Sequence, residues 1–151
     1  MLEIKGNLWK FHEQGFPVVI TTNCEVNGKD EAIMGKGVAL EAKHRFPDLP
    51  RMLGTHIQKF YSDVKYFLDF NLFAFPTKYN WREKANYDLI SESAVGLAGA
   101  VNHLLAQDNF DDKFKKIYMV PPGCGYGHLD WKVVKYILAH YLNDRFIVVT
   151  K

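Results

Sequence analysis

The sequence has few cysteines, and it lacks the closely spaced cysteines and histidines that build metal centres. Its two cysteines, Cys24 and Cys124, form no CxxC pair, and its six histidines show neither an HExxH motif nor ligand-like spacing. Tetrahedral metal sites depend on such closely spaced ligands, so we predict no metal. We expect both thiols to be reduced, as they are in a cytoplasmic protein.

Long apolar runs are also missing. The most apolar stretch, residues 67–75, is broken by Asp69 and Asn71, whereas a membrane-spanning helix needs about 20 apolar residues. The chain opens with Met1-Leu2-Glu3 and lacks the basic segment and apolar stretch of a signal peptide. We therefore expect a cytoplasmic protein that has no membrane partner.

Neither sign of charge dominates the composition. Nineteen Lys and Arg residues stand against 17 Asp and Glu residues, a formal net charge of +2, so the overall charge gives no argument for binding nucleic acid, although a local basic patch is compatible with it. A chain of 151 residues, 48% of them hydrophobic, is long enough to bury one sizeable core and too short for two. We predict a single domain over residues 1–151, acting as a monomer.

Segments typical of strands alternate with segments typical of helices. The strand-like segments are residues 2–5, 17–22, 116–120 and 146–149, and residues 65–75 form either one long strand or a pair of strands. The helix-like segments are residues 8–13, 38–46, 90–105 with Asn86 or Asp88 as N-cap, and 134–141 with Asp130 as cap. This alternation predicts an α/β fold with a mostly parallel sheet covered by helices on both faces.

Two loops rich in glycine each lie between a strand-like and a helix-like segment. The first glycine loop is residues 34–37 and the second is residues 121–127, with the turn at Pro76-Thr77-Lys78 between them. Without side chains, backbone N–H groups can close on phosphate oxygens, and a following helix adds the positive end of its dipole. Such loops fall at the carboxyl ends of the strands, where α/β sheets bind ligands. The sequence therefore predicts a site that holds a diphosphate, as in a nucleotide.

In order along the chain, several segments resemble a macro domain. They are Asn23, residues 34–40, residues 75–78 with Trp81 and Arg82, residues 121–125 with Gly127, and residues 129–131. They look most like the DarG branch, antitoxins whose macro domain removes ADP-ribose from thymidine bases in single-stranded DNA. The resemblance spans nearly the whole chain. It implies a three-layer α/β/α sandwich with a mixed sheet, ADP-ribose or an ADP-ribosylated macromolecule as ligand, single-stranded DNA as a candidate partner, and no cofactor.

The ligand-binding residues that we expect come from both glycine loops and from two neighbouring turns. They are Asn7, Leu8, Met34, Gly35, Lys36, Gly37, Val38, Thr77, Pro122, Gly123, Cys124, Gly125, Tyr126 and Gly127. Within this set, Lys36 has the alternative of being a solvated surface lysine. Cys124 is either a nucleophile or, more commonly for a free cysteine, a small packed side chain.

Lys78 and Asn23 are the expected catalytic residues. Lys78 matches the catalytic lysine of DarG-type and related terminal ADP-ribose glycohydrolase macro domains. As a nucleophile its amine must lose a proton, so its pKa must fall by roughly 3 from about 10.4; as an ammonium it orients or stabilises the leaving group. A surface lysine that neutralises phosphate is the alternative. The amide of Asn23 either bridges ribose hydroxyls or caps a turn.

Several residues near these positions have two interpretations. Trp81 and Arg82 either stack on and pair with nucleic acid, or Trp81 anchors its loop in the core. His128 either contacts the ligand or lies at the surface. The segment from Glu25 to Ile33 is longer than in the DarG pattern, and either gates the cleft or forms a solvated loop.

The chain departs from related macro domains at two positions. The terminal ADP-ribose glycohydrolases carry an aspartate where this chain has Gly127, so cleavage of protein esters by a Lys/Asp pair loses support. Many macro domains carry an aspartate that accepts from the adenine amino group, where this chain has Gly6-Asn7-Leu8. Asn7 can accept through its amide oxygen, but without charge, which weakens adenine binding.

Three functions are compatible with these residues. The leading one is an ADP-ribosyl hydrolase that acts on a macromolecule, most of all on a thymidine base in single-stranded DNA. The second is a phosphatase of ADP-ribose 1″-phosphate. The third is a non-catalytic module that binds ADP-ribose or a related nucleotide.

Overall fold

The computed structural model describes residues 1–107 and 112–151, and its strands and helices alternate as the sequence predicts. The strands are β1 (Leu2–Lys5), β2 (Val18–Asn23), β3 (Lys65–Phe67), β4 (Leu72–Lys78), β5 (Ile117–Met119) and β6 (Phe146–Thr150). The helices are α1 (Leu8–Glu13), α2 (Gly37–Arg45), α3 (Leu49–Phe60), α4 (Tyr87–Leu105) and α5 (Trp131–Ala139).

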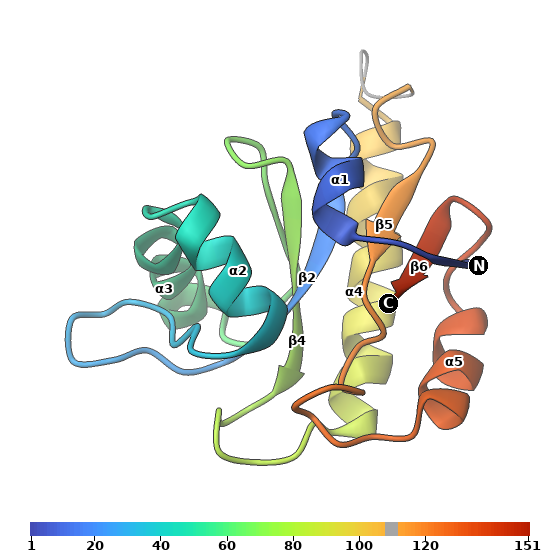
Figure 1. The fold of residues 1–151 in the computed structure, drawn as a ribbon. Coiled ribbons are helices and arrows are strands. Elements are labelled where there is room, and N and C mark those ends of the chain that lie inside the picture. The colour runs from blue at the N-terminus through green and yellow to red at the C-terminus, as the bar shows by residue number, and fades with distance from the viewer. Residues whose placement is uncertain (108–111) are drawn as a thin grey trace.

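All six strands belong to one sheet with the order β1-β6-β5-β2-β4-β3. Every neighbouring pair is parallel except β3 and β4, which are antiparallel. Helices α1, α2 and α3 cover one face of the sheet, and α4 and α5 cover the other (Figure 1). The predicted three-layer α/β/α sandwich with a mixed, mostly parallel sheet is confirmed.

Side chains alternate between two hydrophobic cores along the central strand β2. Val18 and Ile20 face the core beneath α1, α2 and α3, and Val19 faces the core beneath α4 and α5. All three are at most 1% exposed, which agrees with a β-branched strand covered on both sides. Over residues 1–107 and 112–151, no helix is long and apolar enough to cross a membrane.

The sequence patterns predict most elements, with one omission. The segment 65–75 is a pair of strands, β3 and β4, which resolves the two alternatives. Asn86 and Asp130 cap α4 and α5 as predicted, because the side chain of each accepts a backbone N–H of the first turn. The omission is helix α3. Its buried Leu49, Leu53 and Ile57 recur every four residues, but the stretch also holds Pro50 and Gly54, which interrupt a helical pattern.

The segment 25–33 is a narrow hairpin-like excursion that packs beside α3. Val26 and Ala32 form an antiparallel bridge, and the Ala32 N–H donates to the carbonyl of Pro50 at 2.8 Å. At its tip, residues 27–30 are exposed. The base of the excursion is thus anchored to α3, and its tip is solvated.

Gly54 on α3 allows this close approach. A Cβ at Gly54 would overlap the carbonyl oxygen of Asp30 and lie 3.1 Å from the nitrogen of Ala32, both of them backbone atoms. We expect Gly54→Ala to lower the free energy of unfolding by about 1–3 kcal/mol, because backbone must move to admit the methyl group. Chemical denaturation measures the change.

The matched control is Gly99→Ala on α4, where nothing lies within 4 Å of the added methyl group. There the better helix propensity of alanine should stabilise the protein by up to about 1 kcal/mol. Equal effects of the two substitutions would contradict the close packing of α3 against the excursion.

Candidate functional site

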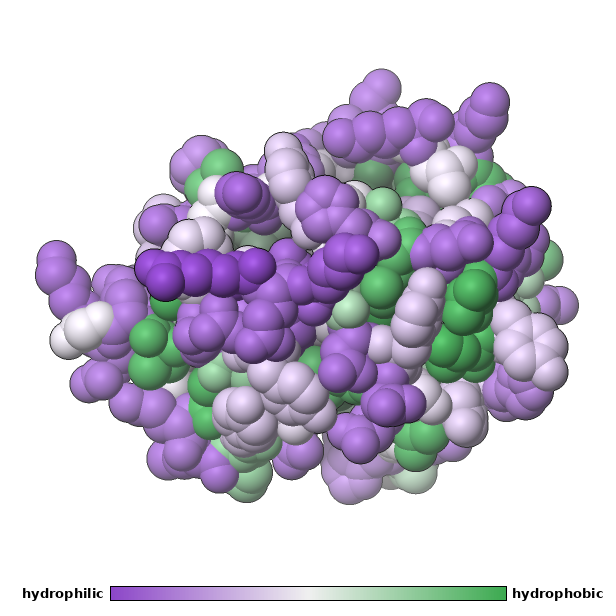
Figure 2. Space-filling view, turned by 90° about the horizontal axis from the view of Figure 1, so that it is seen from below, coloured by the Kyte–Doolittle hydropathy of each residue, from purple (hydrophilic) through white to green (hydrophobic). Residues whose placement is uncertain are grey.

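Both glycine loops and the end of β4 lie at the carboxyl edge of the sheet, at the bottom of Figure 1. Strand β2 ends at Asn23, β4 ends at Lys78, and the second glycine loop follows β5. Figure 2 views this edge directly and shows hydrophilic side chains gathered across the middle of the face. The three segments that the sequence singles out therefore meet at one edge.

A register shift places Asn23 beside Lys78. The parallel ladder pairs Thr22 with Pro76 and then Asn23 with Lys78, so Thr77 is an extra residue on β4. Thr77 is buried, and its hydroxyl donates to the carbonyl of Thr22 at 3.4 Å. Such a bulge re-aims the side chain that follows it. The two predicted catalytic residues are thus neighbours across two strands.

A pocket of about 270 Å³ opens at this edge. Its lining residues are Lys36, Lys78, Trp81, Arg82, Glu83, Lys84, Tyr126 and His128. Four of these are lysine or arginine and one is a carboxylate, so the pocket is electropositive. That charge suits a ligand that carries phosphates.

Lys78 lines this pocket and is partly buried. It donates to the backbone carbonyl of Tyr126 at 3.2 Å. Burial lowers the pKa of Lys78 below its usual value, and the positive charge of Lys36 lowers it further. Both causes favour the neutral amine.

Tyr126 joins the two glycine loops. Its ring lies against Gly37, where a Cβ would be 3.3 Å from the Tyr126 Cδ2, and the Lys36 ammonium is 5.5 Å from the ring centroid. Tyr126 as a whole residue is nevertheless 59% exposed. Gly37 also has a φ of +59°, which a side chain would disfavour. The two loops therefore touch at the outer rim of the pocket.

The second glycine loop is held tightly against the start of α4. The Ala85 N–H donates to the carbonyl of Gly127 at 3.1 Å, and the Leu129 N–H donates to the carbonyl of Gly123 at 2.9 Å. A Cβ at Gly127 would overlap the Gly123 carbonyl oxygen and lie 2.8 Å from the Ala85 Cβ. An aspartate at this position has no room, which gives the physical reason for the glycine found there.

Other glycines leave the backbone open to a ligand. At Gly35 and Gly125, one in each glycine loop, nothing lies within 4 Å of where a Cβ would be. Both are exposed. Open backbone on two facing loops is the arrangement that lets N–H groups approach phosphate oxygens.

Asn23 and Asn7 use their side chains within the protein. The Asn23 amide donates to the carbonyl of Ile33 at 2.9 Å, and its oxygen accepts the Glu25 N–H at 3.0 Å. These bonds hold the two ends of the 25–33 excursion. They agree with the second interpretation of Asn23, in which its amide caps a turn. The Asn7 oxygen caps α1 by accepting the Trp9 N–H at 2.9 Å, so one of its two acceptor positions is used within the protein.

The remaining predicted ligand-binding residues differ in exposure. Buried are Leu8, Met34, Thr77, Pro122, Gly123 and Gly127; Gly37, Val38 and Cys124 are partly buried. The Cys124 thiol donates to the carbonyl of Pro122 at 3.3 Å, and burial raises its pKa to about 11. A thiol held in this way is a poor nucleophile, which favours the alternative of a packed side chain.

Trp81, Arg82 and His128 all line the pocket. Trp81 is 40% exposed, which excludes the alternative that it anchors its loop in the core, and the Arg82 guanidinium lies 4.9 Å from its ring centroid. Glu83 and Lys84 also line the pocket, although no motif in the sequence singles them out. The signal for them is the unbroken charged run that follows Trp81.

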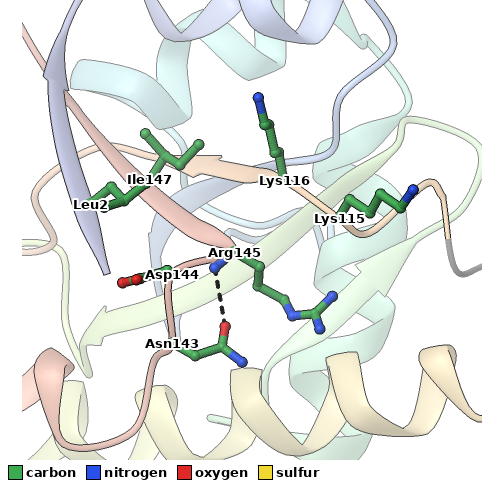
Figure 3. A pocket seen from close by; sticks show the side chains of 7 residues that line it. All are labelled: Leu2, Lys115, Lys116, Asn143, Asp144, Arg145 and Ile147. Atoms are coloured by element: carbon green, nitrogen blue, oxygen red, sulfur yellow. Dashed lines mark hydrogen bonds between the residues drawn. The ribbon is translucent and has the colours of Figure 1, made fainter.

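A second hollow, of about 640 Å³, lies at the amino ends of β5 and β6, away from the glycine loops. Its lining residues are Leu2, Lys115, Lys116, Asn143, Asp144, Arg145 and Ile147 (Figure 3). Several of its charges already have partners, since Arg145 donates to the Phe114 carbonyl at 2.8 Å and Asp144 pairs with the N-terminal amine at 2.6 Å. Its larger size therefore does not make it the better candidate.

Comparison with solved structures shows which known proteins have a similar fold. The macrodomain of Mycobacterium tuberculosis DarG matches 99% of the chain over 97% of its own length, with a TM-score of 0.74 and 21% identity. The macrodomain of Thermus aquaticus DarG matches the same shares, with a TM-score of 0.71 and 23% identity. The chain has the fold of a DarG-type macro domain. The resemblance expected from the sequence is thereby confirmed.

Longer proteins contain similar macro domains. Thermosipho africanus DarTG, solved in complex with ADP-ribose, matches 97% of this chain over 40% of its own, with a TM-score of 0.71 and 18% identity. A curated DNA ADP-ribosyl glycohydrolase of Thermus aquaticus is 27% identical over 112 residues, 68% of this chain. The matched part is 29% of that curated relative. No protein-family model matches the chain.

The hydrogen bonds of Asn23 lead to a test of its structural role. Because Asn23→Ala removes both side-chain bonds from Asn23 to the two ends of the 25–33 excursion, we expect the free energy of unfolding to fall by about 1–3 kcal/mol. The control is Asn102→Ala on the exposed side of α4, which should change stability by less than about 0.5 kcal/mol. Denaturant titration of both variants measures this, and an unchanged stability of Asn23→Ala would contradict the role.

Proposed function

We propose that this macro domain is an ADP-ribosyl hydrolase. It binds ADP-ribose and removes it from a macromolecular acceptor, with a thymidine base in single-stranded DNA as the leading substrate. The two glycine loops hold the diphosphate, and Lys78 stands at the reacting ribose. Two relatives support this assignment: the Thermus aquaticus protein is a DNA ADP-ribosyl glycohydrolase, and Thermosipho africanus DarTG was solved with ADP-ribose.

The observation that carries the proposal is the position of Lys78. Its amine is partly buried at the carboxyl end of β4, in an electropositive pocket between the two glycine loops. Its lowered pKa makes the neutral form more accessible than for an exposed lysine. An amine of this kind is a familiar covalent catalyst.

The chemistry has two routes from the same residue. As a nucleophile, the neutral amine of Lys78 bonds to the anomeric carbon while the acceptor leaves with the electron pair, and water then releases ADP-ribose. As an ammonium, Lys78 donates a proton or a hydrogen bond to the departing acceptor while water attacks the anomeric carbon. In the first route the proton that the bonded amine loses passes to the acceptor, and water supplies the hydroxyl of the free sugar and returns a proton to the amine. In the second route Lys78 gives its proton to the acceptor, and the proton that the attacking water loses restores the ammonium.

A nucleic acid acceptor is favoured by the aromatic and cationic residues at the pocket. Trp81 offers an exposed ring for stacking on a base, and Arg82 lies over that ring. Base stacking on aromatic rings and pairing of cations with phosphates are the two main sources of affinity for single strands. A protein acceptor would not need an exposed tryptophan beside the reacting lysine.

The use of Asn23 within the protein favours a second candidate function. One N–H and one acceptor position of the Asn23 amide are used within the protein, so Asn23 is less free to assist Lys78 at the ribose. A macro domain that binds ADP-ribose without turning it over would have no need of such a helper. The non-catalytic binding module is therefore the alternative.

Replacement of Lys78 tests the leading proposal. We expect Lys78→Ala to reduce release of ADP-ribose from modified single-stranded DNA by at least about 100-fold, because the reacting amine is gone, while affinity for ADP-ribose changes little. Lys132→Ala, an exposed lysine on α5, is the control that should keep both. Release is followed by chromatography and binding by calorimetry.

The same assay distinguishes the alternatives. The wild-type protein is offered modified single-stranded DNA, modified protein and ADP-ribose 1″-phosphate in parallel. Release from DNA alone supports the leading proposal, and phosphate release alone supports the phosphatase. Tight binding of ADP-ribose with no turnover selects the binding module, and full activity of Lys78→Ala removes Lys78 from the mechanism.

We also propose that residues 1–151 form a single domain, acting as a monomer in the cytoplasm. Both cysteines are free, which suits a reducing compartment, and the two cores share one sheet. We expect one cooperative transition in denaturant, seen alike by circular dichroism and tryptophan fluorescence. Light scattering should give the mass of one chain, and separate transitions or a dimer mass would contradict this.

A further inference from the structure

Lys36 occupies a position that ordinarily favours other residue types. It is the N-cap of α2, where its side chain makes no capping hydrogen bond. Ser, Thr, Asn and Asp are preferred at an N-cap, and a positive charge is disfavoured at this end of a helix because the helix dipole is itself positive there. A residue that breaks a local rule in this way is often retained for function.

Lys36 and Lys78 share a pocket and a neighbouring residue. Both lysines line the same pocket, and both contact Tyr126: the Lys36 ammonium lies 5.5 Å from its ring centroid, and the Lys78 ammonium donates to its carbonyl at 3.2 Å. The two lysines come from different elements, the N-cap of α2 and the end of β4. Tyr126 therefore brings two positive charges close together.

The two positive charges of Lys36 and Lys78 repel each other, and the other groups that line the pocket leave this repulsion largely uncompensated. Arg82, Lys84 and His128 line the pocket with it, and Glu83 is the carboxylate among the lining residues. Over residues 1–107 and 112–151, Lys78 forms no ion pair with a carboxylate. Its hydrogen bond is to a neutral carbonyl, so no group of opposite charge in the described part of the chain is bonded to the ammonium.

We propose that Lys36 is a positioning residue that acts through Lys78, by holding a second positive charge against its amine so that the neutral form is populated. This role differs from simple attraction of phosphate, which any cation at the rim would provide. It agrees with the lowered pKa of Lys78, of which burial is the first cause and Lys36 the second. The inference rests on Lys78 being the reacting group of the proposed function, but its protonation can be measured without any turnover.

The experiment compares Lys36→Met, which removes the charge, with Lys36→Arg, which keeps it. Lysine amines are labelled by reductive ¹³C-methylation, and the Lys78 resonance is identified by its loss in Lys78→Arg. Lys36 is exposed, so both variants should fold, and circular dichroism verifies this. The matched control is Lys84→Met, which removes another lysine of the same pocket.

We expect Lys36→Met to raise the pKa of Lys78, because the opposing charge is gone. At a fixed pH, the acylation rate of Lys78 in unlabelled protein should then fall about two- to fivefold, since less neutral amine is present. Lys36→Arg should restore both values, and Lys84→Met should leave both near those of the wild type. If the protein is active, the pH limb of kcat/KM assigned to Lys78 should move in the same direction as its pKa.

The outcomes separate this inference from the proposed function. An unchanged pKa of Lys78 in Lys36→Met overturns the inference even if the enzyme is active. An equal shift in Lys84→Met also overturns it, because any nearby cation would then suffice. A pKa that responds to Lys36 alone, in a protein that hydrolyses none of the substrates, supports the inference and contradicts the proposed function.

Discussion

The candidate site depends on the parallel ladder between β2 and β4. Side chains of a strand alternate between the two faces of a sheet, so a shift of one residue reverses the face on which each lies. Here the extra residue Thr77 makes Lys78, not Thr77, the partner of Asn23. Without that bulge, Lys78 would project toward the opposite face. The hydroxyl bond of the buried Thr77 to Thr22 helps to fix this arrangement.

At the carboxyl edge of the sheet, some polar groups are bonded within the protein and others are free to bind a ligand. Asn23 and Asn7 use their amides on backbone groups, whereas Gly35 and Gly125 keep open backbone. Lys78 is an intermediate case. Its ammonium donates to the backbone carbonyl of Tyr126, and an oxygen of a ligand can take the place of that carbonyl. The site therefore consists of a rigid base and a rim whose contacts are exchangeable.

Sequence patterns predicted much of this arrangement, and the reason is that the signals are local. Glycines between a strand and a helix, and an apolar strand that ends at Lys78, are visible in short windows. The hydrogen bond from Asn23 to Ile33 is not visible in a short window, because Ile33 lies ten residues away across an irregular excursion. The tight fit of Gly127 against Ala85 was equally hidden, since it joins segments 42 positions apart that only the folded sheet brings together. Helix α3 escaped detection because proline and glycine within it mimic a loop.

The excursion of residues 25–33 offers a place to attach a label to this protein. Its base is fixed by the Val26–Ala32 bridge and by the contact with Pro50, while residues 27–30 at the tip are exposed. Exposed tips on a fixed base tolerate added chain. A fluorophore or an immobilisation tag grafted there would be attached to residues that do not line the candidate pocket.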